Sequence, residues 1–221
     1  MLRVSCDAKA VVKVGDYSRH GVSRVKVNAS DHDFKPDEVI IPYGIYLPKH
    51  KELSLYLNPS KATSDFIVDC LDDWWLDTKV RFPKVTMLVL NLDNGPENNS
   101  RRTQFMKRIV AFSRQHHLDV RLAYYPPYHS KYNPIERCWG GLEQHWNGSL
   151  LDSLDAVVGY AQTMTWHGHS PVVKVISKVY QTGVRLTKAL MTEVESQLSR
   201  LESLGRWFID IVWEHLPVSD S

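Results

Sequence analysis

A nearly unbroken apolar run that ends in an acid constrains this chain more than any other feature. Residues 86–92 read Thr-Met-Leu-Val-Leu-Asn-Leu, and Asp93, Asn94 and Gly95 follow. Such a run is typical of a strand that is covered on both faces in the middle of a sheet. Because ligands of open α/β sheets collect outside the carboxyl ends of strands, Asp93 is placed for chemistry. The alternative is that Asp93 only initiates a turn, since Asp and Asn before Gly are ordinary turn residues.

A second acid, Glu136, lies at the start of a predicted helix. Asn133, Pro134 and Glu136 fit its N-cap, N1 and N3 positions, so a capping box would explain Glu136 without catalysis. Glu136 and Glu143 share the face beside an apolar stripe, and an acid there can point into a cleft. Glu143 is therefore the reserve candidate for the same role. The stripe consists of Ile135, Trp139, Leu142 and Trp146.

The N-terminal segment offers a third acid, Asp7. Apolar and polar residues alternate over residues 2–7, as they do in a strand with one buried face. Asp16 and Asp33 compete with Asp7, and the residues alone leave the choice open.

The composition is that of an ordinary globular protein. The chain has 221 residues, of which 43% are hydrophobic and 24% charged, which is enough to bury a sizeable core. Its formal charge of +2 neither requires nor excludes DNA, because acidic metal ligands can offset a basic surface. The N-terminus lacks a basic-then-apolar signal, and no window approaches the roughly 18 apolar residues of a membrane span. We therefore expect a cytoplasmic protein.

Cysteine and histidine spacing argues against a structural zinc site. The three cysteines lie far apart without a Cys-x-x-Cys pair, so we expect them to be reduced and buried. The histidines lack metalloprotease or zinc-finger spacing, and we expect structural or surface roles for them. The residues in question are Cys6, Cys70, Cys138, His116, His117, His167 and His169.

The predicted elements form a mixed α/β order. Strands are expected at 2–14, 23–28, 53–57, 86–92 and 119–123, and helices from residue 60 or 63 to 78, over 100–117, and through Glu136. A loop rich in Asp, Pro and Lys around 29–38 is predicted to be an insertion.

The pattern changes after about residue 150. A helix is expected over 151–164, short extended pieces over 169–184, and a second helix over 187–204. We therefore predict a core domain at 1–150 and a mainly helical extension at 151–221 packed on it. Apolar residues of the second helix fit packing on the core better than pairing with another protomer.

Two segments resemble the second and third acid motifs of DDE transposases and retroviral-type integrases. They are Asp-Asn-Gly-Pro-Glu-Asn at 93–98 and Tyr-Pro-Pro-Tyr-His-Ser-Lys-Tyr-Asn-Pro-Ile-Glu at 125–136. Closer still, the chain is similar to the Rhodopirellula-type DDE transposases of bacterial insertion sequences over nearly its whole length. Further matching segments are 5–9, 15–19, 32–34, 41–46, 74–75, 165–169 and 180–184.

The resemblance implies a ribonuclease-H-like catalytic domain, with a mixed five-stranded sheet flanked by helices. Asp7, Asp93 and Glu136 would be its acidic triad, although Ala8 stands where a Thr often follows the first acid. Two Mg²⁺ or Mn²⁺ ions about 3.5–4 Å apart would be the cofactors, since hard cations prefer oxygen ligands. On this hypothesis Asp7 bridges both ions, Asp93 holds one and Glu136 holds the other.

DNA contacts are predicted from basic and aromatic residues near the acids. Lys9, Lys131 and Arg137 are candidates for positioning phosphates, and Tyr132 for stacking on an unpaired base. Tyr128 and His129 are alternatives for stacking. Basic residues also crowd the start of the helix over 100–117, where an external anion or a solvated basic face would explain them.

We thus expect a transposase catalytic domain that cleaves and transfers strands of double-stranded DNA, both transposon ends and target, in the bacterial cytoplasm near the nucleoid. Self-association is a further expectation. The chain starts a few residues before Asp7, so the N-terminal helix-turn-helix region of related transposases is expected to be missing from a truncated product. The alternatives are a non-catalytic transposase-derived nucleic-acid-binding or assembly module, and a host ribonuclease-H-like nuclease.

Overall fold

The computed structural model describes residues 1–17, 38–126 and 129–215, which form two compact units. The described parts of Met1–Cys6, Thr63–Asn133 and Tyr180–Ser221 form the first unit, and those of Asp7–Ala62 and Pro134–Val179 form the second. The chain therefore passes from one unit to the other several times.

The first unit is built on a mixed sheet in the order β1–β5–β6–β9–β8. Its parallel part pairs β5 with β1 on one side and with β6 on the other, and β9 then joins β6 in the antiparallel direction. In β5, Leu88, Leu90 and Leu92 are almost completely buried, as predicted for a central strand. The strands are β1 (Leu2–Ala8), β5 (Met87–Leu92), β6 (Asp119–Tyr124), β8 (Ser199–Arg200) and β9 (Phe208–Ile211).

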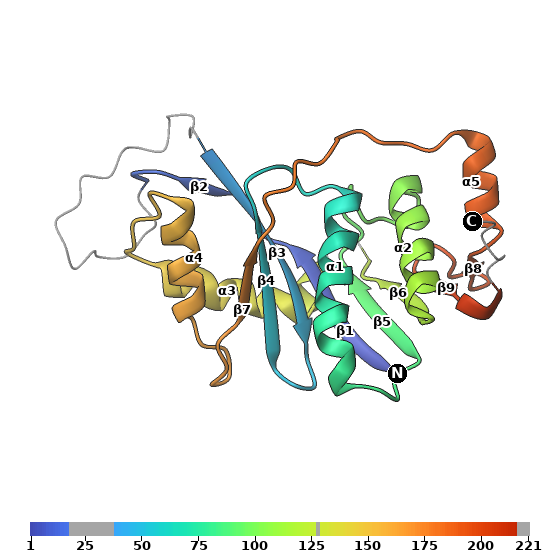
Figure 1. Cartoon of the computed structure of the whole chain (residues 1–221), viewed down its shortest axis with the longest axis horizontal. Helices are drawn as coiled ribbons and strands as arrows, with labels where there is room; N and C mark the ends of the chain where they lie inside the picture. Colours follow the sequence, from blue (N-terminus) through green and yellow to red (C-terminus); the bar gives the residue numbers. More distant parts are fainter. Residues whose placement is uncertain (18–37, 127–128, 216–221) are drawn as a thin grey trace. The chain divides into compact units, whose positions relative to one another are not determined.

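Two helices of the first unit, α1 and α2, pack side by side (Figure 1). Helix α1 begins where Thr63 accepts a hydrogen bond from the Phe66 N–H, as an N-cap residue does. Helix α2 ends at His117, which adopts a left-handed backbone conformation. The helical elements are α1 (Ser64–Thr78), η1 (Lys79–Arg81), α2 (Thr103–His116), η2 (Ser130–Tyr132), α5 (Lys188–Glu195) and η3 (Trp213–His215).

The second unit is built on the strand order β2–β3–β4–β7. Strands β3 and β4 form an antiparallel hairpin, β2 is antiparallel to β3, and β7 is parallel to β4. The strands are β2 (Val12–Val14), β3 (Glu38–Leu47), β4 (Glu52–Asn58) and β7 (Val172–Val175).

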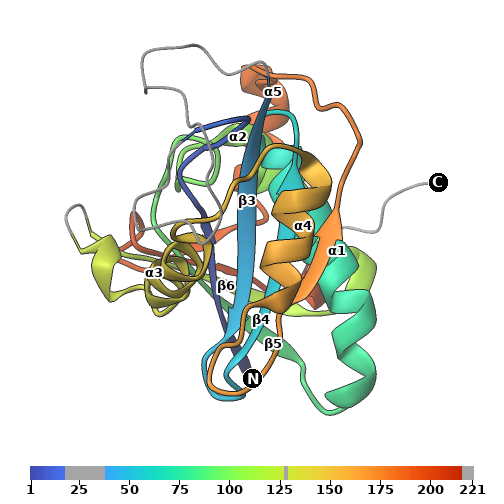
Figure 2. The same ribbon diagram turned by 90° about the vertical axis from the view of Figure 1, so that its left-hand side faces the viewer.

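Helices α3 (Ile135–Trp146) and α4 (Leu154–Thr163) complete the second unit (Figure 2). Helix α3 contacts β3 and α4, and α4 contacts β7. The predicted apolar stripe of α3 is buried and joins the main core cluster of the unit, which also includes Leu53, Leu55 and Leu57 of β4. Gly141 lies against Trp166, because a Cβ atom on it would come within 3.1 Å of that ring.

Three sequence predictions about elements were wrong. The single strand predicted over 2–14 is two strands, β1 and β2. The strand β3 was missed, because Pro42 lies in its middle and proline is unusual inside a sheet. The helix predicted over 187–204 ends at Glu195, since Arg200 turns back to pair with Glu195 and forms β8.

The C-terminal region also departs from a mainly helical extension. The described part of residues 151–221 contributes α4 and α5, but also three strands, β7 in the second unit and β8 and β9 in the first. A domain boundary at residue 150 stays a prediction. Val194 is buried, whereas Leu190 is 46% and Leu201 54% exposed, so the predicted apolar stripe is only partly covered.

Several predictions fall outside the described residues, namely the strand over 23–28, most of the loop over 29–38, Asp33 and Tyr128. In the described part of the chain, no helix is long and apolar enough to cross a membrane. The α/β fold class is confirmed, with nine described strands instead of the five expected.

Candidate functional site

Asp93 follows directly on β5, at the carboxyl end of the parallel part of the first sheet. Its Oδ1 atom accepts hydrogen bonds from the Gly95 N–H at 3.1 Å and from the Asn98 side chain at 2.9 Å. Its Oδ2 atom accepts none from the described residues. Asn94 turns the chain here with a φ of 65°, as Asn readily does. The carboxylate is therefore oriented through one oxygen and open at the other.

The residue that orients Asp93 is itself fixed. Asn98 is buried, and its backbone carbonyl accepts a 2.8 Å hydrogen bond from the hydroxyl of Tyr124 on β6. Burial raises the pKa of Tyr124 well above its usual value, so this hydroxyl keeps its proton. The loop after Asp93 is thus tied to the neighbouring strand.

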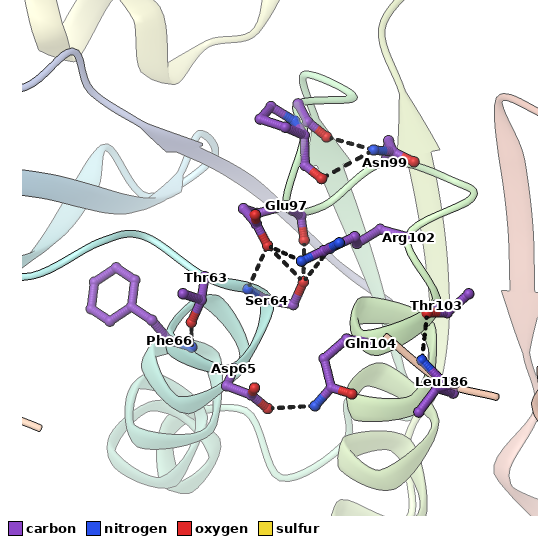
Figure 3. Close-up of polar contacts among 12 residues, drawn as sticks. Thr63, Ser64, Asp65, Phe66, Glu97, Asn99, Arg102, Thr103, Gln104 and Leu186 are labelled. Atoms are coloured by element: carbon purple, nitrogen blue, oxygen red, sulfur yellow. Dashed lines mark hydrogen bonds and ion pairs between the residues drawn. The ribbon is translucent and has the colours of Figure 1, made fainter. Parts of the chain in front are cut away.

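A second set of contacts ties the same loop to the start of α1 (Figure 3). The Ser64 hydroxyl donates to the backbone carbonyl of Glu97 at 2.7 Å, and the Ser64 N–H approaches the Glu97 carboxylate at 3.3 Å. Arg102 donates to the same carboxylate oxygen at 2.9 Å. In Figure 3 the Gln104 amide also reaches Asp65, at 2.9 Å. Glu97 therefore joins the loop, α1 and the start of α2.

Asp7 lies in the second unit, near the end of β1, and is 6% exposed. Its Oδ2 atom accepts a 3.0 Å hydrogen bond from the indole N–H of Trp139 on α3. The Trp139 ring needs Gly44 on β3, because a Cβ atom there would lie 2.6 Å from the ring and 2.5 Å from Ile135. The missing side chain at Gly44 thus lets Trp139 reach Asp7.

Glu136 is the second residue of α3 and is half-buried. It lies one turn before Trp139, so both side chains project from neighbouring positions of the helix surface. Pro134, which immediately precedes α3, has no side-chain hydrogen bond that caps the helix, and the Asn133 side chain binds Ser5 and the Cys6 carbonyl.

The competing acids have different surroundings. Asp16 is exposed, in a turn beyond β2. Glu143 forms an ion pair with Lys9, whose side chain is only 8% exposed. The reserve candidate Glu143 is therefore neutralised by a cation, and the charge of Lys9 is balanced by the same ion pair.

The predicted DNA-binding residues fall into two groups. Lys9 is covered and paired, whereas Lys131, Tyr132 and Arg137 are exposed. The Lys131 ammonium lies 5.3 Å from the centre of the Tyr132 ring, and His129 stacks on the same ring at 5.8 Å. These aromatic surfaces are already in contact with one another.

The cations at the start of α2 also divide into paired and exposed residues. Arg102 pairs with Glu97, and Arg108 pairs with Asp69. Arg101 is exposed and lines a cavity of about 220 Å³ together with Arg206, which comes from the far end of the chain. The cavity is also lined by Asn94, Pro96, Asn99 and Ser100, all in the loop after Asp93. Two like charges converging on one hollow favour an anionic ligand.

A family model described as the Rhodopirellula transposase DDE domain matches residues 2–212. The chain belongs to this family. No curated protein matches this DDE domain. Among solved structures, it resembles the Mos1 transposase paired-end complex with the left transposon end and the Mos1 mariner paired end complex with Mn. The family prediction is thereby confirmed.

The likeness to Mos1 concerns the fold. Both superpositions give a TM-score of 0.52, with 11% and 10% sequence identity, and cover 72% of this chain. The shared fold is ribonuclease-H-like. The DDE domain spans 46% of the Mos1 chains, slightly less than half their length.

The predicted triad is divided between the two units of the DDE domain. Asp93 belongs to the first unit, and Asp7 and Glu136 belong to the second. The residues that the structure describes contain no group of three His, Cys, Asp or Glu side chains that could hold a metal ion. The donor chemistry nevertheless fits a hard divalent cation, because Asp93 offers an open carboxylate oxygen and Asn98 a buried amide oxygen without a donor.

Sequence analysis missed three residues of this arrangement, namely Asn98, Trp139 and Arg206. Asn98 follows Asp93 within the resembling motif, and that spacing was a usable signal. Trp139 was predicted only as a core residue, since a helical stripe does not reveal where an indole N–H points. Arg206 carried no signal, because its neighbours at the cavity lie about a hundred positions earlier in the chain.

Proposed function

We propose that this DDE domain cleaves and transfers DNA strands during transposition, with Asp7, Asp93 and Glu136 as its acidic triad. The observation that carries the proposal is the geometry of Asp93. Its carboxylate follows a buried parallel strand, is oriented by two donors at one oxygen, and is open at the other. A metal-binding carboxylate is commonly held in this way, by hydrogen bonds from outer partners.

Each acid has a distinct part in this proposal. Asp93 would hold one divalent ion through Oδ2, Glu136 would hold a second ion, and Asp7 would bind both. Two Mg²⁺ or Mn²⁺ ions, when bound, activate the attacking water or hydroxyl and stabilise the leaving oxygen of an in-line displacement. Trp139 holds the Asp7 carboxylate in one orientation, and burial of both side chains supports this role.

DNA is held, in the same proposal, by basic residues of both units. Lys131 and Arg137 are exposed and suit contacts with phosphates, and Tyr132 is 62% exposed and suits stacking on a base. Lys9 reaches a phosphate only by leaving Glu143, so we assign it a weaker contribution. The cavity of Arg101 and Arg206 adds a phosphate contact beside Asp93.

The test is nicking of supercoiled plasmid DNA by the purified chain in Mg²⁺ or Mn²⁺. We expect metal-dependent nicking, and a loss of about 100-fold or more in Asp93→Ala, because a ligand of the catalytic ion is gone. Asp16→Ala is the matched control, since Asp16 is an exposed acid that competed with Asp7 in the sequence. It should keep wild-type nicking.

Three results would count against the proposal. No nicking by a folded chain that still binds DNA would favour a non-catalytic binding module. Full nicking by Asp93→Ala would remove this acid from the mechanism. Cleavage confined to RNA–DNA hybrids would favour a host ribonuclease-H-like nuclease. We further propose that the domain acts in the cytoplasm on nucleoid DNA and associates with a second copy when it joins two ends.

A further inference from the structure

Asn98 is the most constrained polar side chain beside Asp93. It is only 4% exposed, and its amide nitrogen donates to Asp93 Oδ1 at 2.9 Å. Its backbone carbonyl is held by the Tyr124 hydroxyl at 2.8 Å. Both its main chain and its side chain are therefore fixed with respect to the acid.

The amide oxygen of Asn98 is buried and accepts no hydrogen bond from the described residues. The orientation of the amide group follows from its partner, since a carboxylate can only accept and must face the NH₂ end. The oxygen is thus directed away from Asp93 Oδ1. A buried acceptor without a protein donor is rare in folded proteins, and an ordered water or the shell of an ion is the usual donor.

Gly95 marks the space that this oxygen faces. A Cβ atom on Gly95 would lie 3.0 Å from Asp93 Oδ2 and 3.3 Å from Asn98 Oδ1. Gly95 does not have the left-handed backbone that favours glycine, so backbone conformation does not require it. The absence of a side chain instead keeps a methyl group from crowding these two oxygens, which both lack donors among the described residues.

We propose that Asn98 is a positioning residue for Asp93, whose amide oxygen accepts a hydrogen bond from the hydration shell of a divalent cation held by Asp93 Oδ2. The inference rests on the proposed function, because it assumes that Asp93 binds such a cation. Asn98 then acts twice: its NH₂ group fixes Oδ1, and its oxygen faces the space in which the cation is hydrated. Gly95 keeps that space open.

The test measures Mn²⁺ binding to the full chain, from the electron paramagnetic resonance signal of the free ion. Asn98→Leu keeps the size of the side chain but removes both polar atoms, and we expect a Kd at least about tenfold weaker. Gly95→Ala keeps the N–H donor to Asp93 and places a methyl group beside both oxygens, so it should weaken binding as well. Asp93→Ala should abolish this binding.

Asn99→Ala is the matched control. Asn99 holds the same loop by donating to the carbonyls of Gly95 and Pro96 at 3.0 and 3.2 Å, but no bond joins it to Asp93. We expect its Mn²⁺ affinity to stay within about twofold of wild type. An equal loss in Asn99→Ala and Asn98→Leu would mean that loop integrity is being measured, and would overturn the inference.

The remaining outcomes separate the inference from the proposed function. Wild-type affinity in Asn98→Leu and Gly95→Ala, with binding lost in Asp93→Ala, would refute the role of Asn98 alone. Wild-type affinity in Asp93→Ala would refute the proposed function itself. Circular dichroism establishes folding for each variant, and if Asn98→Leu does not fold, Gly95→Ala decides.

Discussion

Replacing Trp139 by Phe removes one hydrogen bond from the carboxylate of Asp7 and part of the ring that packs beside Gly44. The indole N–H donates to Asp7 Oδ2 at 3.0 Å, and both side chains are 6% exposed. A hydrogen bond to a charged group contributes about 1.5–3 kcal/mol when it is buried. The smaller ring also leaves a void beside Gly44, where the indole now fits closely. The free energy of unfolding should therefore fall by about 2–4 kcal/mol.

The functional effect should appear in the dependence on metal. Asp7 loses one of the contacts that orient its carboxylate, so the metal concentration for half-maximal nicking should rise about tenfold. Urea denaturation gives the stability, and nicking over a Mg²⁺ titration gives the metal dependence. A purely structural role for Trp139 would lower stability but leave the metal dependence unchanged.

Trp166→Phe is the control for loss of an indole in the same unit. The Trp166 N–H has no hydrogen-bond partner among the described residues. The substitution therefore makes the ring smaller but removes no hydrogen bond from a carboxylate. Its metal dependence should match wild type. The reasoning is refuted if Trp139→Phe also titrates like wild type, or if both variants shift equally.

Three further predictions follow from particular contacts. Arg102 lies 2.9 Å from the Glu97 carboxylate, and the two side chains are 15% and 29% exposed. Arg102→Ala should therefore lower the unfolding free energy by about 1–2 kcal/mol in urea denaturation. Lys107→Ala, at an exposed position, should leave it unchanged. Arg101→Ala combined with Arg206→Ala should lower the slope of log affinity for DNA against log salt by about two, measured by fluorescence anisotropy, and an unchanged slope would contradict the phosphate contact. Burial raises the pKa of Cys138 from 9.0 to about 12, so the thiol ionises in the unfolded chain first, and stability should be lost as pH rises from about 9 to 12. Thermal melts of Cys138→Ala should show a smaller loss over this range. An equally steep loss in the variant would contradict the prediction.

Local periodicity predicted the elements that sit in the cores. The apolar run before Asp93 became a central strand, because residues buried on both faces leave little choice of position. Helix α1 is capped by Thr63, one of the two positions, 60 and 63, that the sequence left open for its start. The apolar stripe of α3 is buried as predicted, because residues at the helical period lie on one face.

Long-range side-chain contacts decided the predictions that were wrong. Asn133, predicted only as a helix cap, also binds Ser5 and Cys6, about 127 positions earlier. Arg200 ended a predicted helix by pairing with Glu195 and with the carbonyl of Ser100. No pattern within a short window contains such partners, so propensity was overridden.

The candidate site shows the same division. The three acids were found as residues of motifs, and the sequence also placed Asp93 at the end of a strand. The donors to Asp93, Gly95 and Asn98, lie within its own motif. Trp139, which donates to Asp7, lies 132 positions away, and Tyr124, which holds Asn98, lies 26 positions away. Such donors can be identified only once the backbone is folded.

The central claim is that Asp93 holds a catalytic divalent ion, and Asp93→Cys tests it most directly. A thiolate is a softer ligand than a carboxylate and binds Mg²⁺ poorly, but it accepts Mn²⁺ better. We predict that folded Asp93→Cys fails to nick DNA in Mg²⁺ and regains part of its activity in Mn²⁺, while Asp16→Cys behaves as wild type in both. Equal activity of Asp93→Cys in the two metals, whether retained or lost, would contradict the account.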